Sequence, residues 1–178
     1  RHLAATNRPL FYLSGPPGSE ASKNRWFGFR WEAARLGLKA HVVQAEHPLP
    51  TLERGREAML AVLASHGGSP LAVFAFNDLM ALGAMDAARD NGLEVPRDIS
   101  VVGVDDTVFA ARVAPPLTTF RVPAREMGAE AMRLLLERIA HPKAPGREVC
   151  YAAPLVVRAS CGVPVAQPAV LASTPYRT

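Results

Sequence analysis

The sequence feature that most restricts the fold is a regular alternation of short apolar runs with longer segments of helical periodicity. The apolar runs, which we predict to be strands, cover residues 9–14, 39–45, 71–76 and 99–104, and the helical segments between them cover 20–36, 51–65 and 78–90. Strands that are apolar throughout and separated by helices favour right-handed crossovers and a parallel sheet with helices on both faces. The predicted fold class is therefore α/β.

Capping residues mark the ends of these helices. Thr51 can cap the second helix, and Gly67–Gly68 can end it. Asn91–Gly92 can close the third helix, because glycine readily takes the left-handed conformation that follows a helix.

The pattern changes after Pro115–Pro116. Residues 117–122 are predicted to be extended, and 124–140 form an amphipathic helix. Residues 148–160 have strand character that Pro154 interrupts, and the chain from residue 163 is expected to be a disordered tail.

Composition excludes several classes of protein. The chain is 49% hydrophobic, which is enough for a packed core, and it has no apolar run long enough to span a membrane. Its net charge of +4 comes from basic residues scattered among acids, which is more typical of a solvated surface than of a DNA-binding patch. Two cysteines, no metal-ligand spacing and no visible signal segment lead us to expect a cytoplasmic protein without a metal.

Polar residues follow each predicted strand at its carboxyl end. They are Ser14–Gly15, residues 44–46, Asn77–Asp78 and Asp105–Asp106. In such folds the carboxyl ends of the strands meet at one edge, where ligands bind, and carboxylates and amides can chelate vicinal hydroxyls or the N–H edge of a base. Arg25 could add paired donors. A competing interpretation is that Asn77 only caps the helix that begins at Asp78.

Three possible enzyme motifs fail on inspection. Gly15-Pro-Pro-Gly-Ser19 resembles the start of a phosphate-binding loop, but Glu20 stands where the second glycine should be, and the lysine is missing. Asp105 and Asp106 are adjacent and therefore point in different directions, and Ser14 lacks the setting of a nucleophile elbow. We expect no catalytic residues and no cofactor.

Several linked blocks resemble the lactose/galactose repressor family of transcriptional regulators. These blocks are residues 14–16, 25–29, 72–85, 92–106 (through Val95–Pro96 and Asp98–Asp106) and 115–119, in the family's order and spacing, so that the resemblance covers about residues 3–162. It implies a core similar to periplasmic sugar-binding proteins, with two α/β subdomains and an effector in the cleft between them. A transport-type sugar receptor with the same fold is the alternative function.

The resemblance also implies roles for individual residues. Arg25, Asn77 and Asp105 match effector contacts, and the helix carrying Leu82 and Met85 would lie at the interface of a homodimer. The effector would be a small polar molecule such as a sugar, and operator DNA would be bound through an N-terminal helix-turn-helix that this sequence does not contain.

The resemblance finally implies a division of the chain. Residues 1–115 would form the main part of the C-terminal effector-binding subdomain, and 116–147 a strand and a helix of the N-terminal subdomain. Residues 148–162 would return to the C-terminal subdomain, and 163–178 would be the tail. We expect the helix over 124–140 to pack partly against a subdomain that is absent from this sequence.

Overall fold

A six-stranded sheet forms the body of the computed structural model, which describes residues 1–44, 47–68 and 70–163. The strand order is β2-β1-β3-β4-β5-β6, and the strands are β1 (Leu10–Leu13), β2 (Ala40–Val43), β3 (Leu71–Ala75), β4 (Ile99–Asp105), β5 (Thr118–Arg121) and β6 (Leu155–Val156). The first five are parallel to their neighbours, and β6 is antiparallel to β5. The predicted α/β class is confirmed.

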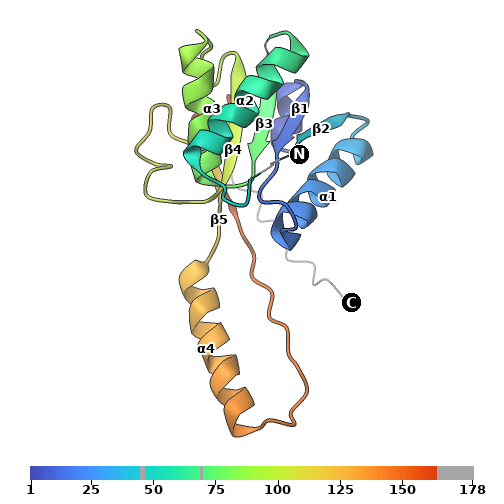
Figure 1. Ribbon diagram of the computed structural model, residues 1–178, viewed down its shortest axis with the longest axis vertical. Coiled ribbons are helices and arrows are strands. Elements are labelled where there is room, and N and C mark those ends of the chain that lie inside the picture. The colour runs from blue at the N-terminus through green and yellow to red at the C-terminus, as the bar shows by residue number, and fades with distance from the viewer. Residues whose placement is uncertain (45–46, 69, 164–178) are drawn as a thin grey trace.

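Helices cover both faces of this sheet (Figure 1). They are the short 3-10 helix η1 (Leu3–Thr6) and the α-helices α1 (Glu20–Arg35), α2 (Leu52–His66), α3 (Asp78–Asp90) and α4 (Ala124–Ala140). The predicted caps are confirmed at α2, where the Thr51 side chain accepts a hydrogen bond from the amide of Arg54 and Gly67 is left-handed.

Alternate strand residues point into two separate cores. On β1, Phe11 and Leu13 pack with α2 and α3, whereas Leu10 and Tyr12 face the side that α1 covers. The four side chains are at most 5% exposed. This two-residue period means that a strand buried on both faces must be apolar throughout, which is why the strands appear as continuous apolar runs in the sequence.

Two glycines allow α2 and α3 to approach closely. A Cβ atom at Gly55 would lie 2.1 Å from the carbonyl oxygen of Met80, and one at Gly83 would lie 1.9 Å from that of Leu52. The neighbouring atoms belong to the backbone and cannot rotate away. These positions therefore require glycine for a packing reason.

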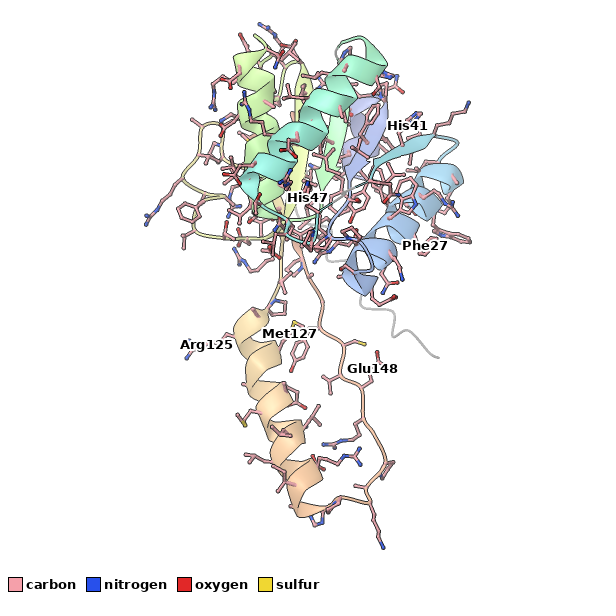
Figure 2. All side chains as sticks on the ribbon, in the orientation of Figure 1. Phe27, His41, His47, Arg125, Met127 and Glu148 are labelled. Carbon is pink, nitrogen blue, oxygen red and sulfur yellow. The ribbon has the colours of Figure 1, made fainter. Side chains whose placement is uncertain are left out.

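α4 extends away from the body on two connecting segments (Figure 1). None of its 17 residues is buried. Met127 lies near the start of the helix (Figure 2), and farther along Glu137 and Arg138 contact the returning segment at Arg147 and Ala144. Its exposed apolar residues are Met127, Met132, Leu135, Leu136 and Ile139.

The structure differs from the sequence predictions in the second half of the chain. The strand expected within 116–147 as part of another subdomain instead pairs with β4 in the main sheet, with Val102 opposite Thr118. Over 148–160 only Leu155–Val156 is a strand, and it pairs with Phe120 and Thr119 of β5. The predicted tail lies outside the described residues beyond Val163. No helix in the described ranges is long and apolar enough to cross a membrane.

Candidate functional site

Arg25 lies on α1 and reaches the carboxyl end of β3. Its Nη1 donates a hydrogen bond of 2.6 Å to the carbonyl oxygen of Phe76. The centre of the guanidinium lies 4.4 Å from the centroid of the Phe76 ring, which is within the range of a cation–π contact. Arg25 is therefore held at the sheet edge where the sequence predicted a ligand site.

Asn77 acts as the N-terminal cap of α3. Its Oδ1 accepts a hydrogen bond from the amide of Met80 at 2.9 Å, and its Nδ2 donates to the carbonyl oxygen of Pro50 at 3.2 Å. The capping interpretation is thus confirmed. It does not exclude a ligand contact, because a carbonyl oxygen can accept two hydrogen bonds.

Asp105 ends β4 with an exposed side chain and a backbone φ of 120°. A φ of this size is uncommon and strained in a residue other than glycine, and such strain clusters at functional sites. Partial loss of solvent around the carboxyl group raises the pKa of Asp105, and the negative charge of Asp78 raises it further. The positive charge of Arg25 acts in the opposite direction. Asp105 and the Phe76 carbonyl that binds Arg25 lie at the carboxyl ends of the neighbouring strands β4 and β3.

Asp78 is a buried residue whose role the sequence did not reveal. Its Oδ1 accepts a hydrogen bond from the Thr119 hydroxyl at 2.6 Å, and its Oδ2 accepts one from the amide of Thr107 at 2.7 Å. Burial raises the pKa of Asp78, and these hydrogen bonds oppose that effect. A Cβ atom at Gly103 would lie 2.5 Å from Oδ1, so the glycine leaves room for the carboxylate.

Asp106 binds both segments that connect the sheet to α4, the one before the helix and the one after it. Arg121, the last residue of β5, donates to its Oδ2 at 2.6 Å, and Arg158, after β6, donates to its Oδ1 at 2.6 Å. Burial opposes ionisation of Asp106, but the two arginines outweigh it and lower its pKa. Neither arginine adjoins Asp106 in the sequence, which is why sequence analysis missed this cluster.

The other polar residues at strand ends have local roles. Ser14 directly follows β1, and its amide donates to the carbonyl oxygen of Val43 at 3.0 Å. Ser19, later in the same connection, caps α1 by accepting from the amide of Ser22. Glu46 falls outside the described residues. In the described part of the chain no group of three or more histidine, cysteine, aspartate or glutamate side chains could hold a metal ion.

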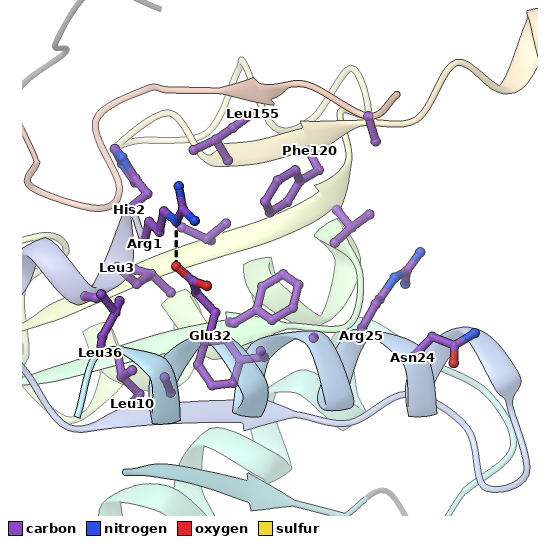
Figure 3. Close-up of a pocket in the computed structure, with 18 of the residues that line it drawn as sticks. Arg1, His2, Leu3, Leu10, Asn24, Arg25, Glu32, Leu36, Phe120 and Leu155 are labelled. Carbon is purple, nitrogen blue, oxygen red and sulfur yellow. Dashed lines mark hydrogen bonds and ion pairs between the residues drawn. The ribbon is translucent and has the colours of Figure 1, made fainter. Parts of the chain in front are cut away.

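A cavity of about 420 Å³ lies between α1 and the sheet (Figure 3). Its walls are mostly apolar and include Phe29, Phe74 and Phe120, with Arg25 at one end and Arg1 at the other. Asn77 and Asp105 do not line it. The cavity is therefore distinct from the polar edge, although the two regions share Arg25.

Leu82 and Met85, the residues expected at a dimer interface, lie on α3 and are only 9% and 2% exposed. Both belong to the core between the sheet, α2 and α3. Near the start of α3 the apolar side chains of Leu79, Val108 and Phe109 are 40%, 66% and 57% exposed. The hydrogen bond from the amide of Thr107 to Asp78 holds this loop against the helix.

Residues 2–161 match the family model described as a periplasmic binding protein-like domain. The chain belongs to that family. Within it, the chain has the effector-binding core of the lactose/galactose repressor type. The family resemblance seen in the sequence is thereby confirmed.

Three known proteins illustrate this relationship. The HTH-type transcriptional regulator MalR of Streptomyces coelicolor is 47% identical over 129 residues, which are 71% of this chain and 37% of the relative. The Lac repressor dimer bound to operator and an anti-inducer is 30% identical, with a TM-score of 0.77 over 90% of this chain and 55% of that one. The CelR–cellobiose complex is 30% identical, with a TM-score of 0.79 over 89% and 48%.

This chain spans about half the length, or less, of these relatives. The relatives are regulators of transcription rather than enzymes, as the sequence led us to expect. The alternative of a transport-type sugar receptor is not favoured, because the relatives named above regulate transcription.

Proposed function

We propose that this chain is the effector-binding and dimerisation portion of a transcriptional regulator, and that its effector is a sugar or a related small polar metabolite. Arg25, Asn77 and Asp105 form the effector site. The observation that carries the proposal is the convergence of Arg25 and Asp105 at the carboxyl edge of the sheet, where the exposed Asp105 carboxylate follows a strained backbone position. A guanidinium and a carboxylate at the same edge of the sheet offer both donors and acceptors to vicinal hydroxyls.

The known structures support a sugar, since CelR was solved with cellobiose. The effector would bind between this body and a second subdomain of a longer protein. Closing the two subdomains around it would shift the population of conformations and so change how a dimer presents its DNA-binding parts.

A thermal-shift screen of the full-length protein tests this site. The screen would use sugars, nucleosides and sugar phosphates, and we expect at least one compound to raise the melting temperature. Asp105→Ala should abolish that rise and should prevent the compound from changing operator binding. If no compound stabilises the protein and Asp105→Ala leaves operator release unchanged, the effector role is refuted.

The dimer would form around the start of α3. Leu82 and Met85 are nearly covered within one chain, so the exposed Leu79, Val108 and Phe109 would supply most of the contact, with Leu82 at its edge. Large exposed apolar side chains gathered in one region are typical of an interaction surface. The Lac repressor neighbour was itself solved as a dimer.

Sedimentation equilibrium tests the dimer surface. Phe109→Ser should convert a dimer to a monomer, or weaken dimerisation at least tenfold. Phe27→Ser is the matched control, because Phe27 is equally exposed at 55% but lies on α1. Equal effects of the two substitutions would contradict this placement of the interface.

α4 would pack against the second subdomain of the longer protein. None of its residues is buried here, and helices in globular proteins are stabilised mainly by packing of such a face. The chain of 178 residues should therefore bind a hydrophobic dye, and Leu135→Glu should reduce that binding. Absence of dye binding by the unaltered chain would refute this.

DNA recognition would belong to a helix-turn-helix of the longer protein, in the cytoplasm. Among the described residues, η1 and α1 to α3 lie in the body around the sheet and α4 is the remaining helix. The net charge of +4 comes from residues dispersed over the sequence. Residues 1–178 alone should therefore show no sequence-specific shift of operator DNA in a gel, whereas a sequence-specific shift would contradict the proposal.

A further inference from the structure

We propose that Phe76 is a positioning residue that holds Arg25 in the orientation needed for effector binding. This inference rests on the proposed role of Arg25 in the effector site. Phe76 is not a predicted ligand contact, and its function would be exerted through Arg25.

Phe76 holds Arg25 in two ways. Its carbonyl oxygen accepts a hydrogen bond from Nη1 at 2.6 Å, and its ring lies under the guanidinium at 4.4 Å. A guanidinium carries five N–H groups in one plane, and this hydrogen bond uses one of them. Contact with both the face and one edge of the plane determines the direction in which the remaining N–H groups point.

The Phe76 ring also packs closely against the turn after β1. An ideal Cβ atom at the buried Gly15 would lie 2.4 Å from two ring atoms, Cγ and Cδ2, so the ring occupies the space where any other side chain would begin. The amide of Phe76 donates to the carbonyl oxygen of Leu13 at 3.0 Å, which ties its backbone to the end of β1. Phe76 also packs against the core under α2 and α3.

The Phe76 ring thus has close contacts with both the backbone of Gly15 and the guanidinium of Arg25. Holding a long arginine side chain in one rotamer has an entropic cost that an unpositioned arginine would have to meet when a ligand binds. The contacts with Phe76 already fix the Arg25 side chain in the ligand-free protein, so ligand binding need not order it. Arg25 is therefore preorganised to present paired donors at the sheet edge where β4 ends in Asp105.

The motion of Arg25 in the ligand-free chain tests this proposal directly. In the full chain labelled with ¹⁵N-arginine, the Nε–Hε signal of Arg25, assigned by its loss in Arg25→Lys, should have an order parameter near that of rigid backbone, about 0.85. In Phe76→Leu it should fall below about 0.6, to the level of the exposed Arg125 in the same spectrum. Phe76→Tyr retains the ring and should keep Arg25 rigid.

Two further variants separate positioning from general damage. Gly15→Ala should displace the ring and mobilise Arg25 as Phe76→Leu does. Phe27→Leu is the matched control, because Phe27 lies on the same helix as Arg25 but contacts Arg30, and it should leave the Arg25 signal unchanged. A flexible Arg25 in the unaltered chain, or a rigid one in Phe76→Leu, would overturn the proposal.

The NMR result requires no ligand, so it can fail independently of the effector screen. A ligand from that screen should bind Phe76→Leu at least tenfold more weakly and Phe76→Tyr normally. A ligand that binds unaltered protein and Arg25→Lys equally would remove Arg25 from the effector site, and with it the functional part of this inference, whatever the NMR signal shows.

Discussion

α3 and α4 have similar amphipathic sequences but opposite environments. Nine of the 13 residues of α3 are buried, whereas none of the 17 residues of α4 is. α3 packs on α2 and the sheet, and α4 extends from the body on its two connecting segments (Figure 1). The comparison shows that an apolar stripe predicts a helix and the face it will bury, but the partner that covers this face need not lie nearby in the sequence.

The strongest way to test this contrast is to add one methyl group to α3. Gly83→Ala would place a Cβ atom 1.9 Å from the backbone of α2, so the two helices must separate. We expect the free energy of unfolding to fall by about 3 kcal/mol or more, because overpacking against backbone cannot relax through a rotamer change. Urea unfolding measures this change. A decrease of less than about 1 kcal/mol would show that the backbones of α2 and α3 are not in tight contact at Gly83.

Shortening one methionine side chain in each helix should have an almost equally large effect in α3 and very little in α4. Met80 in α3 is 1% exposed, and Met80→Ala should lower the free energy of unfolding by about 2–3 kcal/mol by leaving a cavity. Met132 in α4 is 56% exposed, and Met132→Ala should change it by less than about 0.5 kcal/mol. Similar losses in urea unfolding would mean that α4 is packed in solution.

The salt bridges of Asp106, which join the two segments that connect the sheet to α4, can be tested by changing the pH. The pKa of Asp106 is lowered in the folded state, so its ionised form stabilises the fold above the ordinary pKa of 3.8, and this contribution is lost as pH falls through the lower folded value. Asp106→Asn should therefore destabilise the chain by about 2 kcal/mol at pH 7 and by progressively less below pH 3.8.

The control is Asp86→Asn, which removes an exposed partner of Arg89 within α3 and should change stability little at either pH. Urea midpoints at pH 7 and pH 3 provide the measurement. A loss in Asp106→Asn that does not depend on pH would show that the carboxylate charge has no stabilising role.

Apart from the control substitutions, the smallest expected effect is a gain in stability. Gly128 in α4 has no atom within 4 Å of the position a Cβ would take, unlike Gly83. Gly128→Ala should raise the free energy of unfolding of the helix by about 1 kcal/mol, because alanine has the higher helix propensity. Circular dichroism during thermal unfolding would record this gain, and a loss of helix would contradict the open surroundings of α4.

Much of the fold could be predicted because its determinants are local. α3 was predicted at the residues where it occurs, and α4 likewise, since the periodicity and capping of each lie within the segment itself. The strand over 117–122 was also found, but it was assigned to another subdomain. Its partner β4 ends 13 residues earlier, at Asp105, and only pairing shows which sheet a strand joins.

The site could be predicted only in part. Asp105 and Arg25 were identified as candidates, but the burial of Asp78 depends on Thr119, 41 residues away, and the salt bridges of Asp106 depend on an arginine 52 residues away. The Phe76 ring under Arg25 joins residues 51 apart. No residue type or spacing in the sequence predicts these contacts.

The sequence alone determined the succession of strands and helices, the α/β class and the edge where polar groups gather, because hydrophobic period and capping act over a few residues. The tertiary structure decided which carboxylate is buried, which is exposed and which is bound by arginines. Asp78, Asp105 and Asp106 are the same residue type, and they differ only in what the folded chain places around them. Burial and charge are properties of three-dimensional surroundings, and those surroundings come from parts of the chain that are distant in sequence.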